Sequence, residues 1–260
     1  MNPAQTVLIT GASSGIGREL AHHFARDGYR LVLVARRLAA LESLERELTR
    51  PGGASVTSIV ADLSTADGAR RLHETLAAEG IIVDVLVNNA GVGMRGAFVD
   101  LPLDRQLEMM TLNMTALTVL SRLLAPGMVQ RRRGGVLNVA SMAAFQPGPF
   151  MAAYFATKAY VLSFSEAIAD ELEGTGVVVS CLCPGPTETS FAAAAGATRS
   201  RLFQGEMMSA AEAARIGYKA FKEGKSLVIA GRRNRMMQLL VRVLPRRMVR
   251  KSVRRLNTDV

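Results

Sequence analysis

The stretch Thr6-Val-Leu-Ile-Thr-Gly-Ala-Ser-Ser-Gly-Ile-Gly17 decides the fold of this chain. Its first five residues are typical of a short buried strand, and apolar side chains recur at helical spacing after Gly17. The glycines allow a tight turn, a close approach of backbone to phosphate and close packing of helix on strand. Strand, glycine turn and helix in this order predict a dinucleotide diphosphate at the helix N-terminus. The expected contacts are Gly11, Ser13, Ser14, Gly15, Ile16 and Gly17.

Apolar runs alternate with amphipathic segments along most of the chain. This alternation predicts an α/β protein with a single doubly wound, parallel, seven-stranded sheet, a Rossmann fold. The expected strands after the first are 30–35, 55–60, 83–87, 135–140, 177–183 and 226–230. With 260 residues, 49% of them hydrophobic, the chain can bury a large core. We expect residues 1–230 to form the nucleotide-binding catalytic domain and residues 231–260 to extend it.

The end of the second predicted strand distinguishes NAD from NADP. An NAD site usually has a carboxylate there for the ribose 2′-hydroxyl, whereas this chain has Ala35 followed by Arg36 and Arg37. Guanidinium groups suit a 2′-phosphate, so we predict NADP(H) bound through Arg36. Arg37 can equally open the next helix at the surface. Asp62-Leu63 follows the third strand, where Asp62 either meets the adenine or caps the turn.

A second motif, between Ser141 and Lys158, holds groups suited to proton transfer. Tyr154 and Lys158 are four residues apart, so on a helix they share one face. A nearby positive charge favours the phenolate, and we therefore expect Lys158 to lower the pKa of Tyr154 from about 10. Ser141 ends a predicted strand, at the sheet edge where ligands bind. Taken alone, these residues can equally be a buried tyrosine, a solvated lysine and a strand-ending serine.

Asn113 lies among apolar residues of a long predicted helix, 103–129. A buried amide needs partners, so we expect Asn113 to interrupt the regular helical hydrogen bonding and to hold a water molecule. The loops 88–91 and 184–189 each follow a predicted strand and contain small residues that allow a ligand to approach the backbone.

These motifs together resemble the short-chain dehydrogenase/reductase family, of the NADP-preferring carbonyl reductase type. The resemblance extends from residue 6 to about residue 230. It implies four catalytic residues: Tyr154 as acid and base, Lys158 to lower its pKa and bind the nicotinamide ribose, Ser141 to position the substrate carbonyl, and Asn113 to support a water linked to the lysine. It also implies a homodimer or homotetramer. Further cofactor contacts implied by the family are Asn89, Ala90, Gly91, Pro184, Gly185, Thr187 and Thr189.

The expected substrate is a hydrophobic ketone, aldehyde or acyl-type carbonyl, or the alcohol in reverse. Flexible methionines and aromatic rings near the expected nicotinamide suit an apolar, irregular ligand. The same side chains can equally pack in the core or at a dimer interface. They are Met94, Met142, Phe145, Phe150, Met151 and Phe191.

The positive charge of the chain is concentrated at its C-terminus. Residues 231–260 contain ten Lys and Arg residues and one Asp, or +9 of the net charge of +10. Since residues 1–230 are nearly neutral, nucleic-acid binding is not supported. Apolar residues recur at helical spacing on both sides of Pro245, which predicts a basic amphipathic hairpin or a pair of short basic amphipathic helices. They can lie on an anionic membrane surface, cover the active-site mouth or pack on a neighbouring subunit.

Further sequence features bear on the cellular location of the protein, on metal binding and on its function. We expect a cytoplasmic protein, peripheral to a membrane where the basic tail binds one, because no signal peptide precedes the first strand and no run of about 18 uncharged apolar residues occurs. Cys181 and Cys183 are too close together for a framework disulfide or a metal site, so we expect no metal. The leading function is an NADP(H)-dependent oxidoreductase. The alternative is a catalytically weak NADP(H)-sensing protein that docks to a membrane or partner through its tail.

Overall fold

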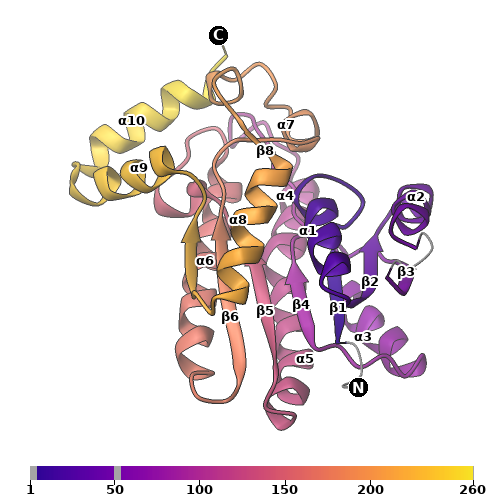
Figure 1. The fold of residues 1–260 in the computed structure, drawn as a ribbon. Coiled ribbons are helices and arrows are strands. Elements are labelled where there is room, and N and C mark those ends of the chain that lie inside the picture. Colours follow the sequence, from indigo (N-terminus) through magenta and orange to yellow (C-terminus); the bar gives the residue numbers. More distant parts are fainter. Residues whose placement is uncertain (1–4, 50–53, 260) are drawn as a thin grey trace.

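A parallel sheet forms the centre of the computed structural model, which describes residues 5–49 and 54–259. Its strand order is β3-β2-β1-β4-β5-β6-β9 (Figure 1). The strands are β1 (Thr6–Thr10), β2 (Arg30–Ala35), β3 (Val56–Val60), β4 (Val85–Asn88), β5 (Gly134–Val139), β6 (Val177–Cys183) and β9 (Leu227–Ile229). The predicted seven-stranded, doubly wound sheet is therefore confirmed, and β1, β2 and β6 have the expected bounds.

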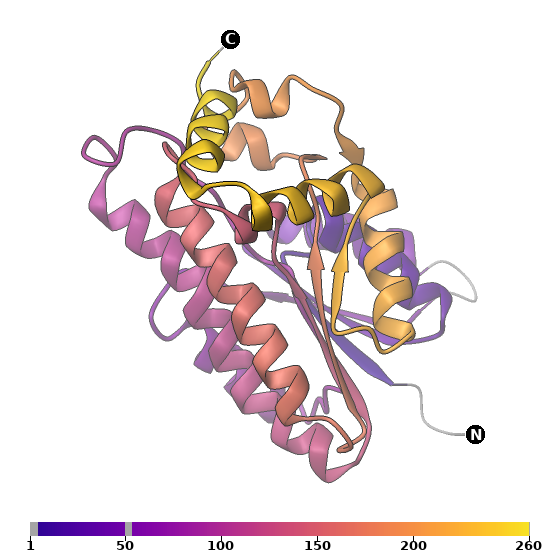
Figure 2. The ribbon, with the colours of Figure 1, turned by 90° about the vertical axis from the view of Figure 1, so that its left-hand side faces the viewer.

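Helices cover both faces of the sheet because its strands are apolar on both faces. Val7 and Ile9 pack into the layer that also holds α1, α2 and α8, while Leu8 packs into the layer that holds α3 and α5. Figure 2 shows α5 and α6 along one face and α8 along the other. The helices are α1 (Gly15–Arg26), α2 (Leu38–Leu48), α3 (Gly68–Ala78), α4 (Leu103–Met110), α5 (Leu117–Gln130), α6 (Ala152–Glu171) and α8 (Ala210–Lys222).

The strand order reverses between β1 and β4, and this reversal places the site. After β3 the chain crosses back to pair β4 with β1, so loops from the two halves of the sheet diverge at the carboxyl ends of these strands. Ligands of open α/β sheets bind in the crevice that forms at such a point.

The long helix expected at 103–129 is not uniform. A π-helical segment, η1 (Thr111–Ala116), separates α4 from α5 and contains Asn113, so the expected interruption is confirmed. Within the described residues, Leu103–Gln130 is long and apolar enough to span a membrane by length and composition. Leu120 and Met128 of this segment are buried in the core beside the sheet, which is the place of a core helix.

Residues 191–205 contain two short helices, α7 (Phe191–Ala194) and η3 (Arg201–Phe203). Two short strands that were not expected, β7 (Thr187–Glu188) and β8 (Met208–Ser209), pair beside them. Ser209 caps α8, because its side chain accepts a hydrogen bond from the backbone N–H of Glu212.

The C-terminal residues form two helices, α9 (Arg232–Val243) and α10 (Arg246–Asn257), with Pro245 between them. Both helices lie beyond the carboxyl ends of the strands (Figure 1). In α10, Val249 and Val253 are buried in the same apolar cluster as Tyr154. Of the three placements open from the sequence, the structure shows α10 packed over the site.

Candidate active site

The loop between β1 and α1 is shaped by glycine. Gly11 and Gly15 have φ angles of +65° and +56°, in the left-handed region. A Cβ atom at Gly17 would lie 2.3 Å from Asn89 Nδ2 and 2.6 Å from the carbonyl oxygen of Gly11. Asn89 Nδ2 fixes this loop by donating hydrogen bonds to the carbonyls of Thr10 and Gly11, at 3.0 and 3.1 Å. The loop thus leads into the α1 N-terminus, where unpaired N–H groups favour an anion.

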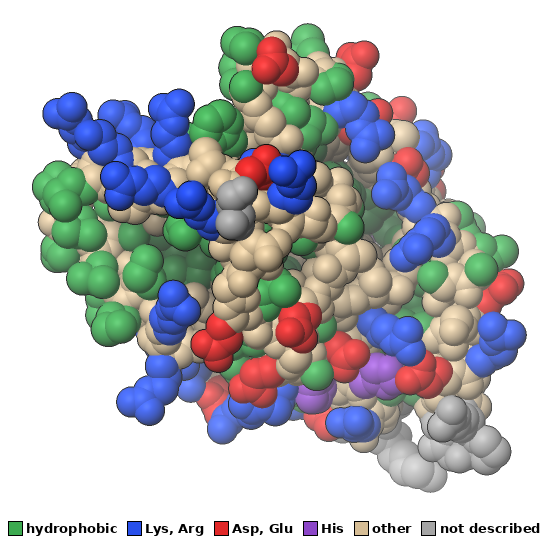
Figure 3. Space-filling view, turned by 90° about the horizontal axis from the view of Figure 1, so that it is seen from above, with side chains coloured by type: hydrophobic (Ala, Val, Ile, Leu, Met, Phe, Trp, Pro, Cys, Tyr) green, Lys and Arg blue, Asp and Glu red, His purple; other side chains and the backbone are tan. Residues whose placement is uncertain are grey.

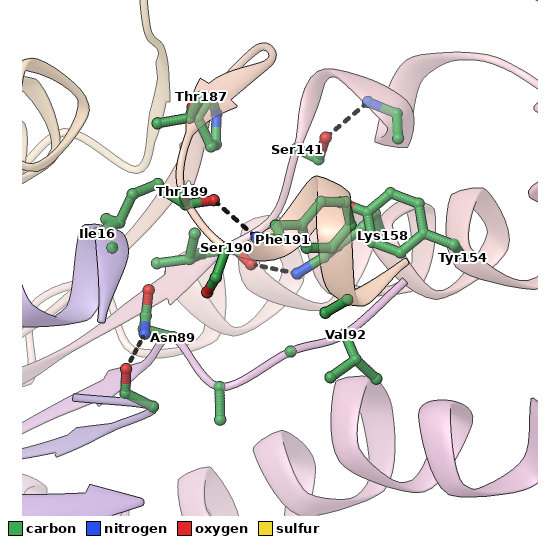
Figure 4. Close-up of a pocket in the computed structure, with 18 of the residues that line it drawn as sticks. Ile16, Asn89, Val92, Ser141, Tyr154, Lys158, Thr187, Thr189, Ser190 and Phe191 are labelled. Carbon is green, nitrogen blue, oxygen red and sulfur yellow. Dashed lines mark hydrogen bonds between the residues drawn. The ribbon is translucent and has the colours of Figure 1, made fainter. Parts of the chain in front are cut away.

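A cavity of about 530 Å³ runs from this loop to the tyrosine and lysine of α6. Apart from Gly17, which packs against Asn89 instead, each residue expected to contact the cofactor lines it. The lining comes from the loops after β1, β2, β3, β4, β5 and β6, as expected for a crevice at the switch point. Figure 4 shows Ile16 and Asn89 at one end of the view, and Ser141 and Tyr154 toward the other.

The end of β2 carries two guanidinium groups and no carboxylate. Arg36 and Arg37 line the cavity, and no carboxylate of the described residues forms an ion pair with either. Asp62 Oδ1 accepts hydrogen bonds from the N–H and hydroxyl of Ser64, at 2.9 and 2.6 Å, so it caps the turn as well as lining the cavity. Burial opposes ionisation of Asp62, but these bonds and the Arg36 charge outweigh it and lower its pKa. The positive charge of the Arg36–Arg37 pair is therefore available to a ligand phosphate.

Tyr154 and Lys158 lie on α6, and both are buried. Burial lowers the pKa of Lys158 to about 8. Burial also raises the pKa of Tyr154 to about 12, while a hydrogen bond with Ser141 acts in the opposite direction. The sequence expectation of a lowered Tyr154 pKa is therefore wrong for this structure. The reason is geometric: Lys158 Nζ lies 6.0 Å from the ring centre and donates to the carbonyl of Val139 at 2.8 Å.

Ser141 lies between β5 and α6, and its hydroxyl group can donate a hydrogen bond. It is the N-cap residue of a 3₁₀ helix, η2 (Met142–Phe145), and its Oγ accepts a 3.1 Å hydrogen bond from the N–H of Ala143 (Figure 4). Because that bond occupies an acceptor position, the O–H can donate, either to the Tyr154 oxygen or to a ligand oxygen beside it.

Asn113 ties the loop after β4 to α6. Its Oδ1 accepts from the N–H of Val92 at 3.0 Å, and its Nδ2 donates to the Val92 carbonyl at 2.9 Å and to Thr157 Oγ1 at 3.0 Å. A Cβ atom at Gly91 would lie 3.2 Å from Asn113 Oδ1 and 3.4 Å from Lys158 Nζ, so glycine lets this loop pass close to both. The structure thus brings Asn113 and Lys158 together, and the expected water stays a prediction.

The other end of the cavity is apolar. Met142, Met151 and Phe191 line it, and the Phe191 ring lies 5.1 Å from the Tyr154 ring, centre to centre. Residues that the sequence argument missed also contribute: Ala143, Phe155, Leu202, Phe203, Val253 and Leu256. The helical spacing of Val253 and Leu256 marked them as one face of a helix but could not show what that face covers.

Three residues expected at the substrate end do not line the cavity. Phe145 packs against the core cluster that contains Cys181 and Cys183, and Met94 packs against the cluster around Tyr154. Phe150 has a φ angle of +66°, and the Arg254 guanidinium lies 5.3 Å from its ring centre. These side chains support the walls of the site instead of facing its interior.

Comparison with known proteins supports this interpretation. The sequence model of the short chain dehydrogenase family matches residues 5–200. A short chain dehydrogenase of Pseudocercospora fijiensis is 38% identical over 191 residues, which cover 73% of this chain and 62% of the relative. The chain therefore spans about three fifths of the length of that relative.

Two solved structures cover nearly the whole chain. A short-chain dehydrogenase from Sphingobium yanoikuyae in complex with NADPH superposes with a TM-score of 0.81 at 33% identity, covering 93% of this chain and 96% of the other. The bulky-bulky ketone specific alcohol dehydrogenase from Comamonas testosteroni superposes with a TM-score of 0.77 at 31% identity, covering 93% and 95%.

Proposed function

The chain belongs to the short-chain dehydrogenase family, and from that premise we propose that it uses NADPH to reduce bulky, apolar ketones or related carbonyl compounds, and NADP⁺ to oxidise the corresponding alcohols. Membership supports the general activity, hydride transfer with a nicotinamide cofactor. One observation supports the finer proposal most strongly: Ser141, Tyr154 and an apolar wall occupy the same cavity as the glycine loop.

The residues of the cavity fit a dinucleotide. Gly17 has no space for a side chain because Asn89 holds the loop, and the N-terminus of α1 directs N–H groups to the place of a diphosphate. Arg36 and Arg37 are suited to hold a 2′-phosphate, and Ala35 offers no carboxylate to a 2′-hydroxyl. This charge pattern supports NADP(H) over NAD(H). When bound, the reduced nicotinamide supplies the hydride.

Proton transfer falls to Tyr154. Its raised pKa keeps the phenol protonated at neutral pH, so in the reductive direction it can donate a proton to the oxygen of the substrate carbonyl. The O–H of Ser141 can donate a hydrogen bond to the same oxygen and stabilise the negative charge that develops there. Lys158, buried one helical turn away, lines the same cavity, where its ammonium group can donate a hydrogen bond to the nicotinamide ribose.

The apolar wall supports a bulky substrate. Met142, Met151 and Phe191 line the cavity together with Tyr154, and so do Val253 and Leu256 of α10. Such a surface offers few hydrogen bonds and favours a ligand that removes apolar area from water. The similar Comamonas enzyme is specific for bulky-bulky ketones, which are ligands of this class.

The test is NADPH oxidation over a panel of ketones graded in size, with NADH as the comparison. We expect kcat/KM to rise with the apolar bulk on both sides of the carbonyl and to be higher with NADPH than with NADH. Tight NADPH binding without turnover across the panel would instead favour the cofactor-sensing alternative.

We also propose that the protein acts in the cytoplasm as a homodimer or homotetramer. Four large apolar side chains on α4 and α6 are exposed in the single chain: Leu103, Leu107, Met110 and Tyr160. Covering them with a second copy would remove this area from water. Light scattering on the purified protein tests the assembly, and a monomer at micromolar concentration would reject it.

A further inference from the structure

We propose that α9 and α10 form a docking surface for anionic phospholipid bilayers, and that apolar substrate reaches the cavity from the bilayer along α10. The apolar strip of this surface consists of Met236, Leu239, Leu240, Val243, Leu244 and Met248. Its cationic part consists of Arg232, Arg233, Arg235, Arg242, Arg246, Arg247, Arg250, Lys251, Arg254 and Arg255.

The apolar residues of helix α9 face solvent, whereas those of a typical surface helix face the core. Polar Gln238 is buried, with 7% of its surface exposed, whereas Met236, Leu239 and Val243 are 59%, 59% and 78% exposed. Together with Leu240 these apolar residues have the spacing i, i+3, i+4, i+7, which in a soluble protein usually faces the core. Since this spacing faces solvent here, the strip lacks a partner in the single chain.

The charges around the strip identify that partner. Both helices together contain ten basic residues and no acidic one. Among residues 5–49 and 54–259, no carboxylate forms an ion pair with any of the ten. The nearby acid in sequence, Asp259, is paired with Arg95 at 2.8 Å. An apolar strip beside unpaired cations is complementary to lipid acyl chains beneath anionic headgroups.

Figure 3 shows this arrangement on the surface. Hydrophobic side chains gather at the left, where α9 and α10 lie in Figure 1, and Lys and Arg side chains lie beside them. The apolar and cationic parts therefore lie next to each other on this side of the molecule.

Other occupants fit this surface less well. In a symmetric contact with a second copy, the basic residues of one chain would lie near those of the other. No acidic residue of α9 or α10 would offset their repulsion. A nucleic acid would pair with the cations but leave the apolar strip in water. A bilayer offers acyl chains to the apolar strip and anionic headgroups to the cations.

The second side of α10 connects the docking surface to the site. Val253 and Leu256 line the cavity, while Lys251 and Arg255 are exposed to solvent. The end of α10 is held to the body, because Asn257 Nδ2 donates to the carbonyl of Pro149 at 2.8 Å and Arg95 Nε donates to the carbonyl of Asn257 at 2.7 Å. A bilayer bound by the outer side of α10 would therefore lie next to a wall of the cavity. The entry route rests on the proposed function, whereas the docking does not.

The first experiment measures docking without turnover. The full chain is sedimented with phosphatidylcholine vesicles that contain either no phosphatidylserine or 30% phosphatidylserine by composition. We expect binding to the anionic vesicles at least tenfold stronger than to neutral ones. Leu239→Ser should weaken this binding about tenfold. The control is Ile82→Ser, which alters a similarly exposed apolar side chain just before β4 and should leave vesicle binding unchanged.

Charge variants test the cationic part. Each basic residue near an anionic surface strengthens binding about fivefold, so the triple variant Arg247→Gln/Lys251→Gln/Arg255→Gln should lose roughly a hundredfold. The matched triple Arg70→Gln/Arg105→Gln/Arg122→Gln removes the same charge from other helices and should change binding less than threefold. Thermal melting and NADPH titration confirm that each variant is folded. Equal binding to both kinds of vesicle, or equal loss in the matched variants, would overturn the docking proposal.

Two further outcomes are informative. A dimer that Leu239→Ser dissociates, with no vesicle binding by the wild type, would assign the strip to a second copy and overturn the proposal. For the entry route, Leu239→Ser should lower turnover of a ketone dissolved in anionic vesicles severalfold and leave turnover of a short water-soluble ketone unchanged. Equal loss on both ketones would reject the route, while inactivity of the wild type on both would reject the proposed function and leave the docking result standing.

Discussion

Lys158 Nζ donates a 2.8 Å hydrogen bond to the backbone carbonyl of Val139, the last residue of β5. This bond holds an ammonium group in a buried position near Tyr154. Burying a charge destabilises the folded state, and the same burial lowers the pKa of Lys158 to about 8. Lys158 therefore lowers the stability of the folded state, which indicates that it is present for the function of the site.

Replacing this lysine by an apolar residue should stabilise the protein and inactivate it. Lys158→Met keeps most of the side-chain volume and removes the buried charge, so we expect the free energy of unfolding at pH 7 to rise by about 1–3 kcal/mol. Turnover should fall to the level of the assay blank. Urea unfolding at pH 7, with NADPH turnover in parallel, checks both. A less stable Lys158→Met protein would contradict the account.

The same lysine predicts how stability depends on pH. Between its folded pKa of about 8 and its unfolded value of 10.5, the unfolded chain binds more protons, so stability rises with pH. Below pH 8 the full destabilisation is present. Wild-type unfolding curves should therefore shift to higher urea from pH 8 to about pH 9, before Tyr154 titrates in the unfolded chain, where its pKa is 10.0. Lys158→Met should lose most of this shift, and a shift of the same size would reject the assignment.

Arg36 should select the cofactor. Charge-assisted hydrogen bonds contribute about 1.5–3 kcal/mol, so Arg36→Ala should weaken NADP(H) binding about 10- to 100-fold and leave NAD(H) binding nearly unchanged. Arg37→Ala, which alters the neighbouring residue at the start of α2, provides the comparison and should have a smaller effect. Fluorescence titration with both cofactors measures the ratio. An equal loss for NADPH and NADH would contradict a contact with the 2′-phosphate.

Gly17 should be needed for the shape of the glycine loop. A Cβ atom there would lie 2.3 Å from Asn89 Nδ2, so Gly17→Ala must displace the side chain that fixes the loop. We expect at least a tenfold loss of NADPH affinity, measured by titration. In Gly205→Ala the new Cβ would meet nothing within 4 Å, and that variant should bind NADPH as the wild type does. Wild-type affinity in Gly17→Ala would show that the loop accommodates a side chain.

Local patterns predicted most of the fold and the cofactor end of the cavity. Thr6–Thr10, Arg30–Ala35 and Val177–Cys183 are apolar runs bounded by turns, and their strands have the expected bounds. The Asn113 interruption was also predictable, because an amide amid apolar residues needs partners outside the helix.

The rest depends on contacts between distant segments. The pKa of Tyr154 reflects how deeply α6 is buried and where Lys158 finds its acceptor, and neither follows from a spacing of four residues. Val253 and Leu256 line the cavity because α10 folds back over the site, more than 90 residues after Tyr154 in the chain. The 3.6-residue repeat of an amphipathic helix shows that one face is covered, but not by what. The prediction that Phe145 lines the cavity is wrong for the same reason. Ala143 and Gln146 line the cavity, whereas the Phe145 ring packs against the core.

The most direct measurement of the central claim is a single turnover of enzyme-bound NADPH with a bulky ketone, in wild-type protein and in Tyr154→Phe. The substitution removes one hydroxyl and keeps the ring that packs on Phe191. If Tyr154 donates the proton, NADPH affinity should be unchanged and the rate of NADPH oxidation should fall about 10²- to 10⁴-fold. A Tyr154→Phe protein that oxidises NADPH within threefold of the wild-type rate would contradict the account.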